Sequence, residues 1–383
     1  MWWLTVLLFC LLLAPAAAQP RVRIALVERG AAATVEGPGG LTLKTGDGAR
    51  VLQRLSGPVR LKVEGDRVLL DGKAQPAPVL LVPSRGMFYV GERGYRGYLR
   101  LLADRGRLTA VDVLPLEDYL AGVLGGEIPA DWPPATQRAL AVAARTYAVY
   151  LLGDPRSPEY DLVATDQDQV YAGLDGESSA SRAALAATRD QVLVGADGRV
   201  LKAYYSSNCG GHTSDSQPVF GDKVPAIAGI PDPYCAGCPG ESWSRTFSVQ
   251  EVRARLGKDG KPLGTLVEAT LNGHDRSGRI REFRLLDSEG QELLLSGQEL
   301  RRILGYRELR STRCTLTITA FNLLQGRKVP SLLRFEGSGW GHGVGLCQWG
   351  ALRMGEQGMG YRQILAHYYR GSRIVAGSSV LPR

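Results

Sequence analysis

One glutamate of this chain has the sequence setting of a catalytic acid. Glu127 follows a pair of glycines and precedes Ile128 and Pro129, so its neighbours in the chain carry no charge. Surroundings of this kind remove water from a carboxyl group and raise its pKa. A raised pKa allows a carboxylic acid to donate a proton near neutral pH. Glu127 is therefore the candidate catalytic acid.

A helix is predicted soon after this glutamate, over residues 135–151. Asp131 can cap it, and the Pro-Pro pair that follows suits a first helical turn, where a missing N–H group costs little. Apolar residues at helical spacing predict one buried face: Ala139, Leu140, Val142, Ala143 and Tyr147. The same helix carries Arg145, a cation with no obvious partner nearby in the sequence.

Three separated blocks of the sequence match motifs of one known family. The first block reads GEIP at 126–129 and continues with AVAARTY at 141–147. The second reads GWGHGVGLCQWGA at 339–351, and the third reads ILAHYYRG at 364–371. In this order the blocks resemble the SpoIID/LytB family of secreted proteins that act on bacterial peptidoglycan. The resemblance covers residues 85–375.

The resemblance implies a lytic transglycosylase with Glu127 as its acid and base. Hydrolysis of a glycosidic bond normally needs two carboxyl groups. A transglycosylase can use one, because the muramyl C6 hydroxyl attacks C1 and gives a 1,6-anhydro sugar without water. Glu117 and Asp118 are the rival carboxyls, but they begin an apolar helical pattern, where acidic residues favour a helix N-terminus. The alternative is a non-catalytic module that binds glycan and stimulates another wall hydrolase, as part of this family is described to do.

Arg145 is a second candidate catalytic residue, because it belongs to the first block. It could bind a lactyl carboxylate or stabilise negative charge near the scissile bond. The alternative is a structural ion pair with an acid such as Asp118.

Four further residues are candidates for binding the glycan. His342 and Gln348 lie in the glycine-rich second block, where glycines let the backbone approach a sugar chain closely. Tyr171 and Gln169 lie in the segment DQDQVYAG, which resembles a family block that borders the cleft. Flat aromatic faces pack on sugar rings, which favours such a role for the tyrosine. The alternative for all four is a buried structural position.

The cysteines suggest either a metal site or a disulfide. Cys209-x-x-His212 and Cys235-x-x-Cys238 supply four soft ligands in two pairs, a set that suits tetrahedral structural zinc. In an oxidising compartment, a disulfide from Cys209 to Cys235 or Cys238 is the simpler alternative. The proposed chemistry itself requires no cofactor. Cys347 stands where the family usually has serine, which favours a small buried packing residue.

The N-terminal segment and the charge of the chain indicate export to the cell envelope. Residues 1–18 are apolar and end in Ala-Ala-Ala, the cleavage pattern of a signal peptide, although a membrane anchor is the competing interpretation. The formal net charge of +8 lies entirely outside residues 1–20. A basic surface attracts anionic polymers, and export favours wall glycan over nucleic acid as the partner. We expect a secreted or periplasmic protein without stable membrane insertion, which binds glycan strands and could work with another wall hydrolase.

The order of predicted elements indicates an α+β protein. Residues 21–84 alternate short apolar strands with glycine- and proline-bearing turns, which predicts an N-terminal β-rich module. Residues 85–375 then form a mixed α/β SpoIID-like domain. Residues 248–325 are predicted to be an inserted small α+β subdomain, in which Ser296 could cap a short helix.

Overall fold

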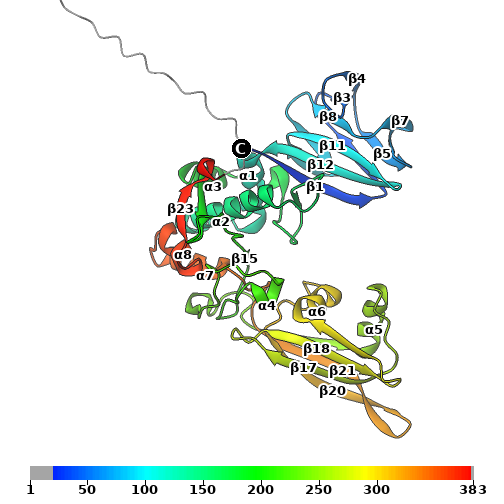
Figure 1. Ribbon diagram of the computed structural model, residues 1–383, viewed down its shortest axis with the longest axis vertical. Coiled ribbons are helices and arrows are strands. Elements are labelled where there is room, and N and C mark those ends of the chain that lie inside the picture. Colours follow the sequence, from blue (N-terminus) through cyan, green and yellow to red (C-terminus); the bar gives the residue numbers. More distant parts are fainter. Residues whose placement is uncertain (1–19, 381–383) are drawn as a thin grey trace, which may run out of the picture.

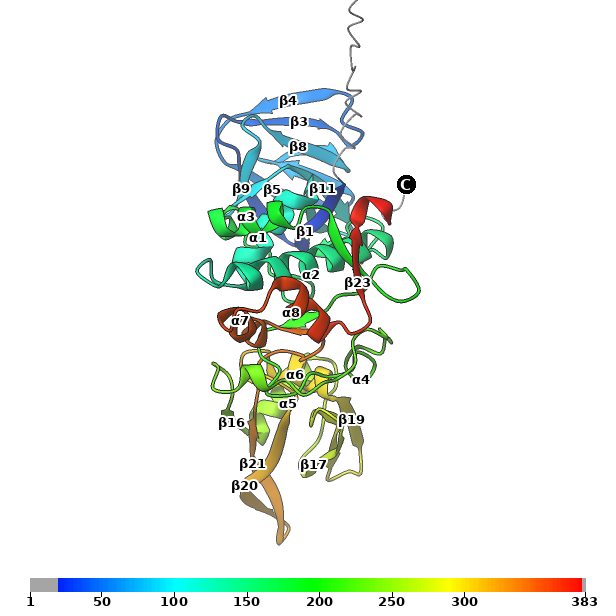
Figure 2. The same cartoon turned by 90° about the vertical axis from the view of Figure 1, so that its left-hand side faces the viewer.

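The computed structural model describes residues 20–380. Three parts follow one another along an elongated molecule: a β-rich part at one end, a helical part in the middle and a second β-rich part at the other end (Figures 1 and 2). The α+β class predicted from the sequence is confirmed. Within the described residues, every helix is too short or too polar to cross a membrane. The predicted signal peptide, residues 1–18, lies outside the described residues.

The N-terminal part consists of two antiparallel sheets packed face to face. Its strands are β1 (Arg21–Gly30), β2 (Ala32–Glu36), β3 (Leu41–Thr45), β4 (Val51–Leu55), β5 (Val59–Glu64), β6 (Arg67–Leu70), β7 (Lys73–Pro76), β8 (Val79–Pro83), β9 (Met87–Val90), β10 (Arg93–Arg96), β11 (Tyr98–Asp104) and β12 (Arg107–Pro115). One sheet has the order β13-β1-β12-β11-β8-β3-β4 and the other β10-β9-β2-β5-β6-β7. Alternate residues point into a shared core, such as Leu81 of the first sheet and Leu61 of the second. Because β12 pairs with both β1 and β11, these sheets extend to Pro115, past the residue 84 expected from the sequence.

The middle part is built around one long buried helix. Its helices are α1 (Leu116–Glu127), α2 (Pro134–Gly153), α3 (Ser179–Ala187), α4 (Gln217–Phe220), α7 (Gln348–Glu356) and α8 (Tyr361–Tyr368). Helix α2, predicted at 135–151, packs against α1, α3, α7 and α8. Asp131 does not cap it, because the helix begins after Pro133, whose side chain makes no capping hydrogen bond. Glu117 and Asp118 lie in the first turn of α1, as predicted from their acidity.

Short strands connect this middle part to distant segments of the chain. They are β13 (Leu162–Val163), β14 (Gln191–Val194), β15 (Tyr205–Ser206), β22 (Leu346–Cys347) and β23 (Arg373–Ala376). Strand β13 lies parallel to β1 and joins the middle part to the N-terminal sheets. Strand β14 pairs with β23, and β15 runs parallel to β22. The pairing of β15 with β22 brings residues near 205 beside the glycine-rich block that begins at 339.

The inserted part has a hydrophobic core of its own. Its elements are β16 (Trp243–Ser248), α5 (Val249–Lys258), β17 (Leu266–His274), β18 (Ile280–Asp287), β19 (Glu292–Ser296), α6 (Gly297–Leu304), β20 (Cys314–Leu324) and β21 (Arg327–Gly337). Buried side chains from Trp243 to Phe335 form this separate core. The predicted cap of α6 is confirmed, because the Ser296 and Glu299 side chains form a capping box.

Candidate functional site

The Glu127 carboxylate lies at the C-terminal end of α1 and accepts three hydrogen bonds from uncharged donors. The backbone N–H of Val170 donates to Oε1 at 2.8 Å, and the Tyr205 hydroxyl lies 3.4 Å from the same oxygen. The Gln348 amide donates to Oε2 at 2.9 Å. Within residues 20–380, no lysine, arginine or histidine forms an ion pair with this carboxylate. Glu127 is partly buried, so it is neither splayed into solvent nor held by a salt bridge.

This environment raises the pKa of Glu127 above its ordinary value. Burial is the largest cause, because a desolvated carboxyl group favours its neutral form. The hydrogen bonds from Val170, Gln348 and Tyr205 favour the charged form and oppose this effect only in part. The protonated acid is therefore more populated near neutral pH than that of an exposed glutamate.

Glycines let a neighbouring segment come directly against the end of α1. A side-chain carbon on Gly125 would lie 2.1 Å from the carbonyl oxygen of Gly176, and one on Gly126 would lie 2.4 Å from that of Val170. Such distances are impossible for a real Cβ atom, so only glycine fits at these positions. The close approach places the Val170 N–H group on the Glu127 carboxylate. The glycine pair therefore has two effects: it permits the contact between Val170 and Glu127, and it leaves Glu127 without charged neighbours in the chain.

A chain of buried polar groups supports the carboxylate from behind. The Tyr119 hydroxyl donates to Oε1 of Gln169 at 3.1 Å. The Gln169 amide in turn donates to the Tyr205 hydroxyl at 3.0 Å and to the carbonyl of Ala144 at 3.2 Å. Because its oxygen accepts from this amide, Tyr205 can direct its own proton at Glu127. The contacts that Tyr205 and the Val170 N–H group make with Glu127 were not predicted, although Val170 belongs to the DQDQVYAG block.

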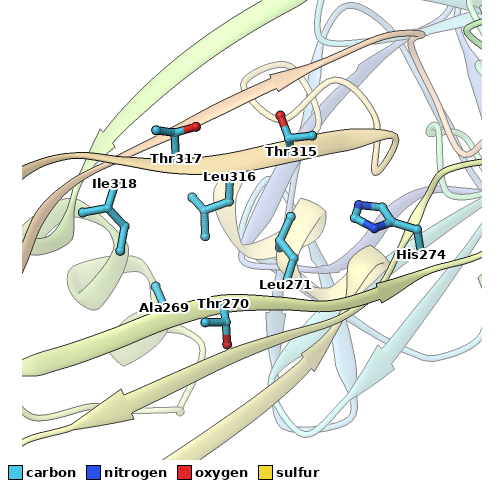
Figure 3. A pocket seen from close by; sticks show the side chains of 8 residues that line it. All are labelled: Ala269, Thr270, Leu271, His274, Thr315, Leu316, Thr317 and Ile318. Carbon is cyan, nitrogen blue, oxygen red and sulfur yellow. The ribbon is translucent and has the colours of Figure 1, made fainter.

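A cavity elsewhere in the molecule carries no comparable chemistry. It has a volume of about 580 Å³ and opens between β17 and β20 of the inserted part (Figure 3). Apolar and threonine side chains line it, together with His274, whose Nε2 lies 3.1 Å from the carbonyl oxygen of Cys314. Because no carboxyl or thiol group lines this cavity, Glu127 remains the centre of the candidate site.

Comparison with known proteins identifies relatives of this chain. The family model described as stage II sporulation protein matches residues 104–194, which contain α1, α2 and Glu127, and a domain of unknown function matches residues 242–345. An uncharacterised protein of Brachyspira hyodysenteriae is 31% identical over 73% of this chain and 72% of its own. Stage II sporulation protein D of Bacillus amyloliquefaciens is 28% identical over 72% of this chain and 78% of its own length. The amidase enhancer of Bacillus subtilis is 27% identical over 67% of this chain and 40% of its own length.

The chain belongs to the SpoIID/LytB family. Its membership supports a role at the cell wall. Gln348, from the glycine-rich family block, was predicted to contact glycan, and the structure places its amide on the catalytic candidate itself. Cys347 caps helix α7, which begins at Gln348, and its sulfur accepts a hydrogen bond from the Gly350 N–H group.

The structure corrects the catalytic role considered for the family arginine, Arg145. Its guanidinium is 1% exposed and forms two hydrogen bonds with the Glu117 carboxylate, at 2.7 and 2.8 Å. It also donates to the carbonyl oxygen of Thr188 at 2.9 Å. These contacts tie α2 to α1 and α3, and none is shared with Glu127. Arg145 is therefore a structural residue, although its partner is Glu117 rather than Asp118.

Tyr171 and Gln169, the residues of the QVY block, do not line a sugar subsite. Both are fully buried. Tyr171 packs between the rings of Tyr95 and Tyr119, at centroid distances of 5.5 and 4.9 Å. Gln169 acts indirectly by holding Tyr205, as described above. Burial excludes a direct contact of either side chain with glycan.

His342 of the same family's glycine-rich block has both ring nitrogens engaged. Its Nδ1 accepts from the Val344 N–H group at 3.0 Å, and its Nε2 donates to the carbonyl of Tyr205 at 2.9 Å. Burial lowers the pKa of His342 to about 3, so the ring is neutral. Its edge contacts Phe220, which stacks on Tyr204 with centroids 4.4 Å apart and is 41% exposed. The predicted polar contact of His342 with sugar is thus wrong. The exposed ring of Phe220 is the better candidate for a contact with sugar.

Two tryptophans that follow Glu127 and Gln348 in the sequence were not predicted as site residues. Trp132 lies shortly after Glu127 in the chain, and Trp349 follows Gln348. Their rings lie 5.1 Å apart, and both are partly exposed. Because sugar rings pack on aromatic faces, this pair is a candidate glycan surface.

The predicted cysteine set is brought together only in part. Cys209 and Cys235 meet with Cys347 and Asp232, and one ligand atom from each of the four lies within 4.8 Å of the others. His212 and Cys238 do not join this cluster, and His212 Nδ1 instead lies 2.6 Å from the carbonyl oxygen of Thr213. All five cysteines of the described residues are free, so the alternative disulfide does not form in this structure. The four clustered residues are the ones that could hold a metal.

Proposed function

We propose that this protein is a peptidoglycan lytic transglycosylase in which Glu127 is the sole acid and base. The observation that carries the proposal is a partly buried carboxyl group of raised pKa, held by three uncharged donors and no cation. A nearby cation would lower the pKa and lock the group as a carboxylate. Uncharged donors allow it to exist in both protonation states.

The reaction uses both states in turn. Protonated Glu127 donates its proton to the bridging glycosidic oxygen while the bond from that oxygen to C1 of the muramyl residue breaks. The resulting carboxylate, stabilised by Val170, Tyr205 and Gln348, then removes the proton of the muramyl C6 hydroxyl. The C6 oxygen bonds to C1 and gives the 1,6-anhydro product. Glu127 regains its proton, and no water is consumed.

The second carboxyl needed for hydrolysis is poorly placed around this site. Asp166 is the acidic residue whose charge raises the pKa of Glu127, and its effect is the smallest of the causes. Asp166 is exposed to solvent. Asp166 is therefore the carboxyl group to replace in a test of hydrolysis against transglycosylation.

Glycan strands are the proposed partner. The partly exposed rings of Trp132 and Trp349 and the exposed ring of Phe220 can pack on sugar rings. The net charge of +8 favours approach to an anionic wall polymer. Glycan strands lie outside the cytoplasm, so the proposal places the protein in the cell envelope or beyond it.

The experiment that tests the proposal is mass spectrometry of glycan strands incubated with the purified protein. Strands with and without stem peptides serve as substrates. Transglycosylation releases fragments lighter by one water than hydrolytic ones, and Asp166→Asn should release them as fast as the wild type. Fragments carrying a reducing-end muramyl residue, together with loss of activity in Asp166→Asn, would instead show hydrolysis by two carboxyls.

A second candidate function is stimulation of a separate wall hydrolase without catalysis. It is favoured by the similarity to the amidase enhancer of Bacillus subtilis. The same strand digestion separates the two functions, because an enhancer alone releases no fragments.

Replacement of Gln348 by methionine should shift the pH dependence of activity upward. The amide stabilises the charged form of Glu127, so its loss raises the pKa of that group further. A hydrogen bond to a charged group contributes about 1.5–3 kcal/mol, which corresponds to roughly one to two pKa units. Because the reaction begins with protonated Glu127, the limb of kcat/KM that falls at high pH should move to higher pH by about this amount.

The pH profile of kcat/KM for Gln348→Met measures this shift, and Gln357→Met, at the exposed C-terminal cap of the same helix, is the matched control. An unchanged limb in Gln348→Met, or a limb moved to lower pH, would contradict the assigned role of Gln348.

A further inference from the structure

Three thiols and one carboxylate converge from separate segments at a buried point behind the Glu127 site. Cys209 follows β15, Asp232 and Cys235 belong to a short turn at 232–235, and Cys347 ends β22. All four residues are buried. One ligand atom from each lies within 4.8 Å of the others.

Two separations among these atoms are close to those of a tetrahedral metal shell. Zinc–sulfur bonds of about 2.3 Å and zinc–oxygen bonds of about 2.0 Å place two sulfurs about 3.8 Å apart and a sulfur and an oxygen about 3.5 Å apart. The Cys209 and Cys235 sulfurs lie 3.5 Å apart, and the Cys209 sulfur lies 3.3 Å from Oδ2 of Asp232. The remaining separations between the four ligand atoms are at most 4.8 Å, so the four groups can contract onto a single ion.

The surrounding hydrogen bonds suit thiolates rather than thiols. The N–H group of Gly211 points at the Cys235 sulfur at 3.1 Å. Two more, from Cys209 and Gly350, point at the Cys347 sulfur at 3.3 and 3.4 Å. A neutral thiol is a weak acceptor, whereas a metal-bound thiolate is commonly held in this way.

Asp232 has a supporting shell but no cation. Its carboxylate accepts from the Tyr368 hydroxyl at 3.0 Å and from the Tyr234 N–H group at 3.2 Å. It is 0% exposed, and no arginine, lysine or histidine of residues 20–380 pairs with it. A buried carboxylate is costly without a compensating positive charge, and a divalent ion between the four groups supplies one.

We propose that Cys209, Asp232, Cys235 and Cys347 bind one structural zinc ion. Four protein ligands close the coordination sphere, so this ion stabilises structure rather than activating water. It joins the end of β22 to the segment after β15. Cys347 precedes Gln348 and Cys209 lies four residues beyond Tyr205, so the ion anchors both side chains that hold Glu127. This assignment does not depend on which reaction Glu127 performs.

Metal analysis of the full chain, purified under reducing conditions, tests the site. The wild type should carry one zinc per chain. Cys209→Ser, Cys235→Ser and Cys347→Ser should each weaken zinc binding by about tenfold or more in competition with a chromophoric chelator. Cys238→Ser and Cys314→Ser, which replace buried cysteines outside the cluster, are the matched controls and should keep the metal.

If the cluster variants fail to fold, the absorption spectrum of the cobalt(II)-substituted wild type still tests the site. Cobalt(II) substituted for zinc should show tetrahedral bands and a charge-transfer band whose intensity corresponds to three thiolates. A metal-free wild type that takes up neither ion would overturn the proposal. So would a Cys209–Cys235 disulfide in non-reduced peptides, or equal metal loss in the two control variants.

Discussion

Glu127→Gln should abolish the release of anhydromuramyl fragments from glycan strands. Glutamine keeps the shape of the side chain and can still accept the Val170 N–H bond, but it can neither donate nor remove a proton in the reaction. General acid and base catalysis by one side chain contributes roughly 10²–10⁴-fold to a rate, and here one group performs both steps. We therefore expect the rate to fall by at least about 10³-fold. Fragment release followed by mass spectrometry measures it.

The melting temperature of this variant should stay close to that of the wild type, because glutamine avoids the cost of burying a carboxylate. Glycan binding, measured by co-sedimentation with purified strands, should also persist. Asp166→Asn is the matched control, since it removes a neighbouring exposed carboxyl and should leave the rate unchanged.

The same variant decides between enzyme and enhancer. Incubation with a cell-wall amidase shows whether Glu127→Gln still accelerates the release of stem peptides. If wild type and variant stimulate the amidase equally, and neither releases anhydromuramyl fragments, the catalytic proposal fails and the enhancer function stands.

Arg145→Met has the second large expected effect, on stability rather than on chemistry. The substitution leaves Glu117 without its partner and removes a donor from the buried Thr188 carbonyl. Removal of one partner from a buried ion pair costs about 3–5 kcal/mol, and the partial exposure of Glu117 places this case near the lower value. Urea unfolding should therefore show a loss of about 3 kcal/mol.

The rate per folded molecule separates this structural role from a catalytic one. We expect kcat of the folded fraction of Arg145→Met to equal that of the wild type, because the arginine shares no contact with Glu127. The surface pair of Arg334 and Glu336 supplies the control: Arg334→Met should cost no more than about 1 kcal/mol. A stable Arg145→Met with lost turnover would restore the catalytic interpretation.

The uncharged donors around Glu127 explain how one group can act twice. Hydrogen bonds from an amide, a hydroxyl and a backbone N–H group would stabilise the carboxylate that forms midway through the proposed reaction. Burial favours the protonated form of Glu127, which is the form that begins the proposed reaction. The two effects oppose one another, and their net result is a pKa of Glu127 above the ordinary value.

The sequence by itself determined the features that depend on near neighbours. Glu127 was recognisable because its flanking residues are uncharged. Helix α2 and the cap of α6 follow from apolar periodicity and from a serine three residues before a glutamate. Such signals are local, since a helix is formed by contacts between residues three and four positions apart.

Only the tertiary structure decided what surrounds Glu127. Val170, Tyr205 and Gln348 lie 43, 78 and 221 residues from it in the chain. No periodicity indicates which of many glutamines or tyrosines will meet a given carboxyl, because strand pairing between β15 and β22 and the close approach at two glycines bring them together. The QVY block illustrates this, since its tyrosine and glutamine entered the core instead of the cleft.

The cysteine cluster follows the same logic. Spacing in the sequence predicted a site made of Cys209, His212, Cys235 and Cys238. In the structure, Asp232 and Cys347 take the places of His212 and Cys238, and Cys347 lies 138 residues from Cys209 in the chain. Local spacing fixes which side chains are near in the chain, but the direction of each strand and turn decides which of them face one another. For the same reason Arg145 was visible as an unpaired cation in the sequence, and its partner, Glu117 on another helix, emerged only when α1 and α2 packed together.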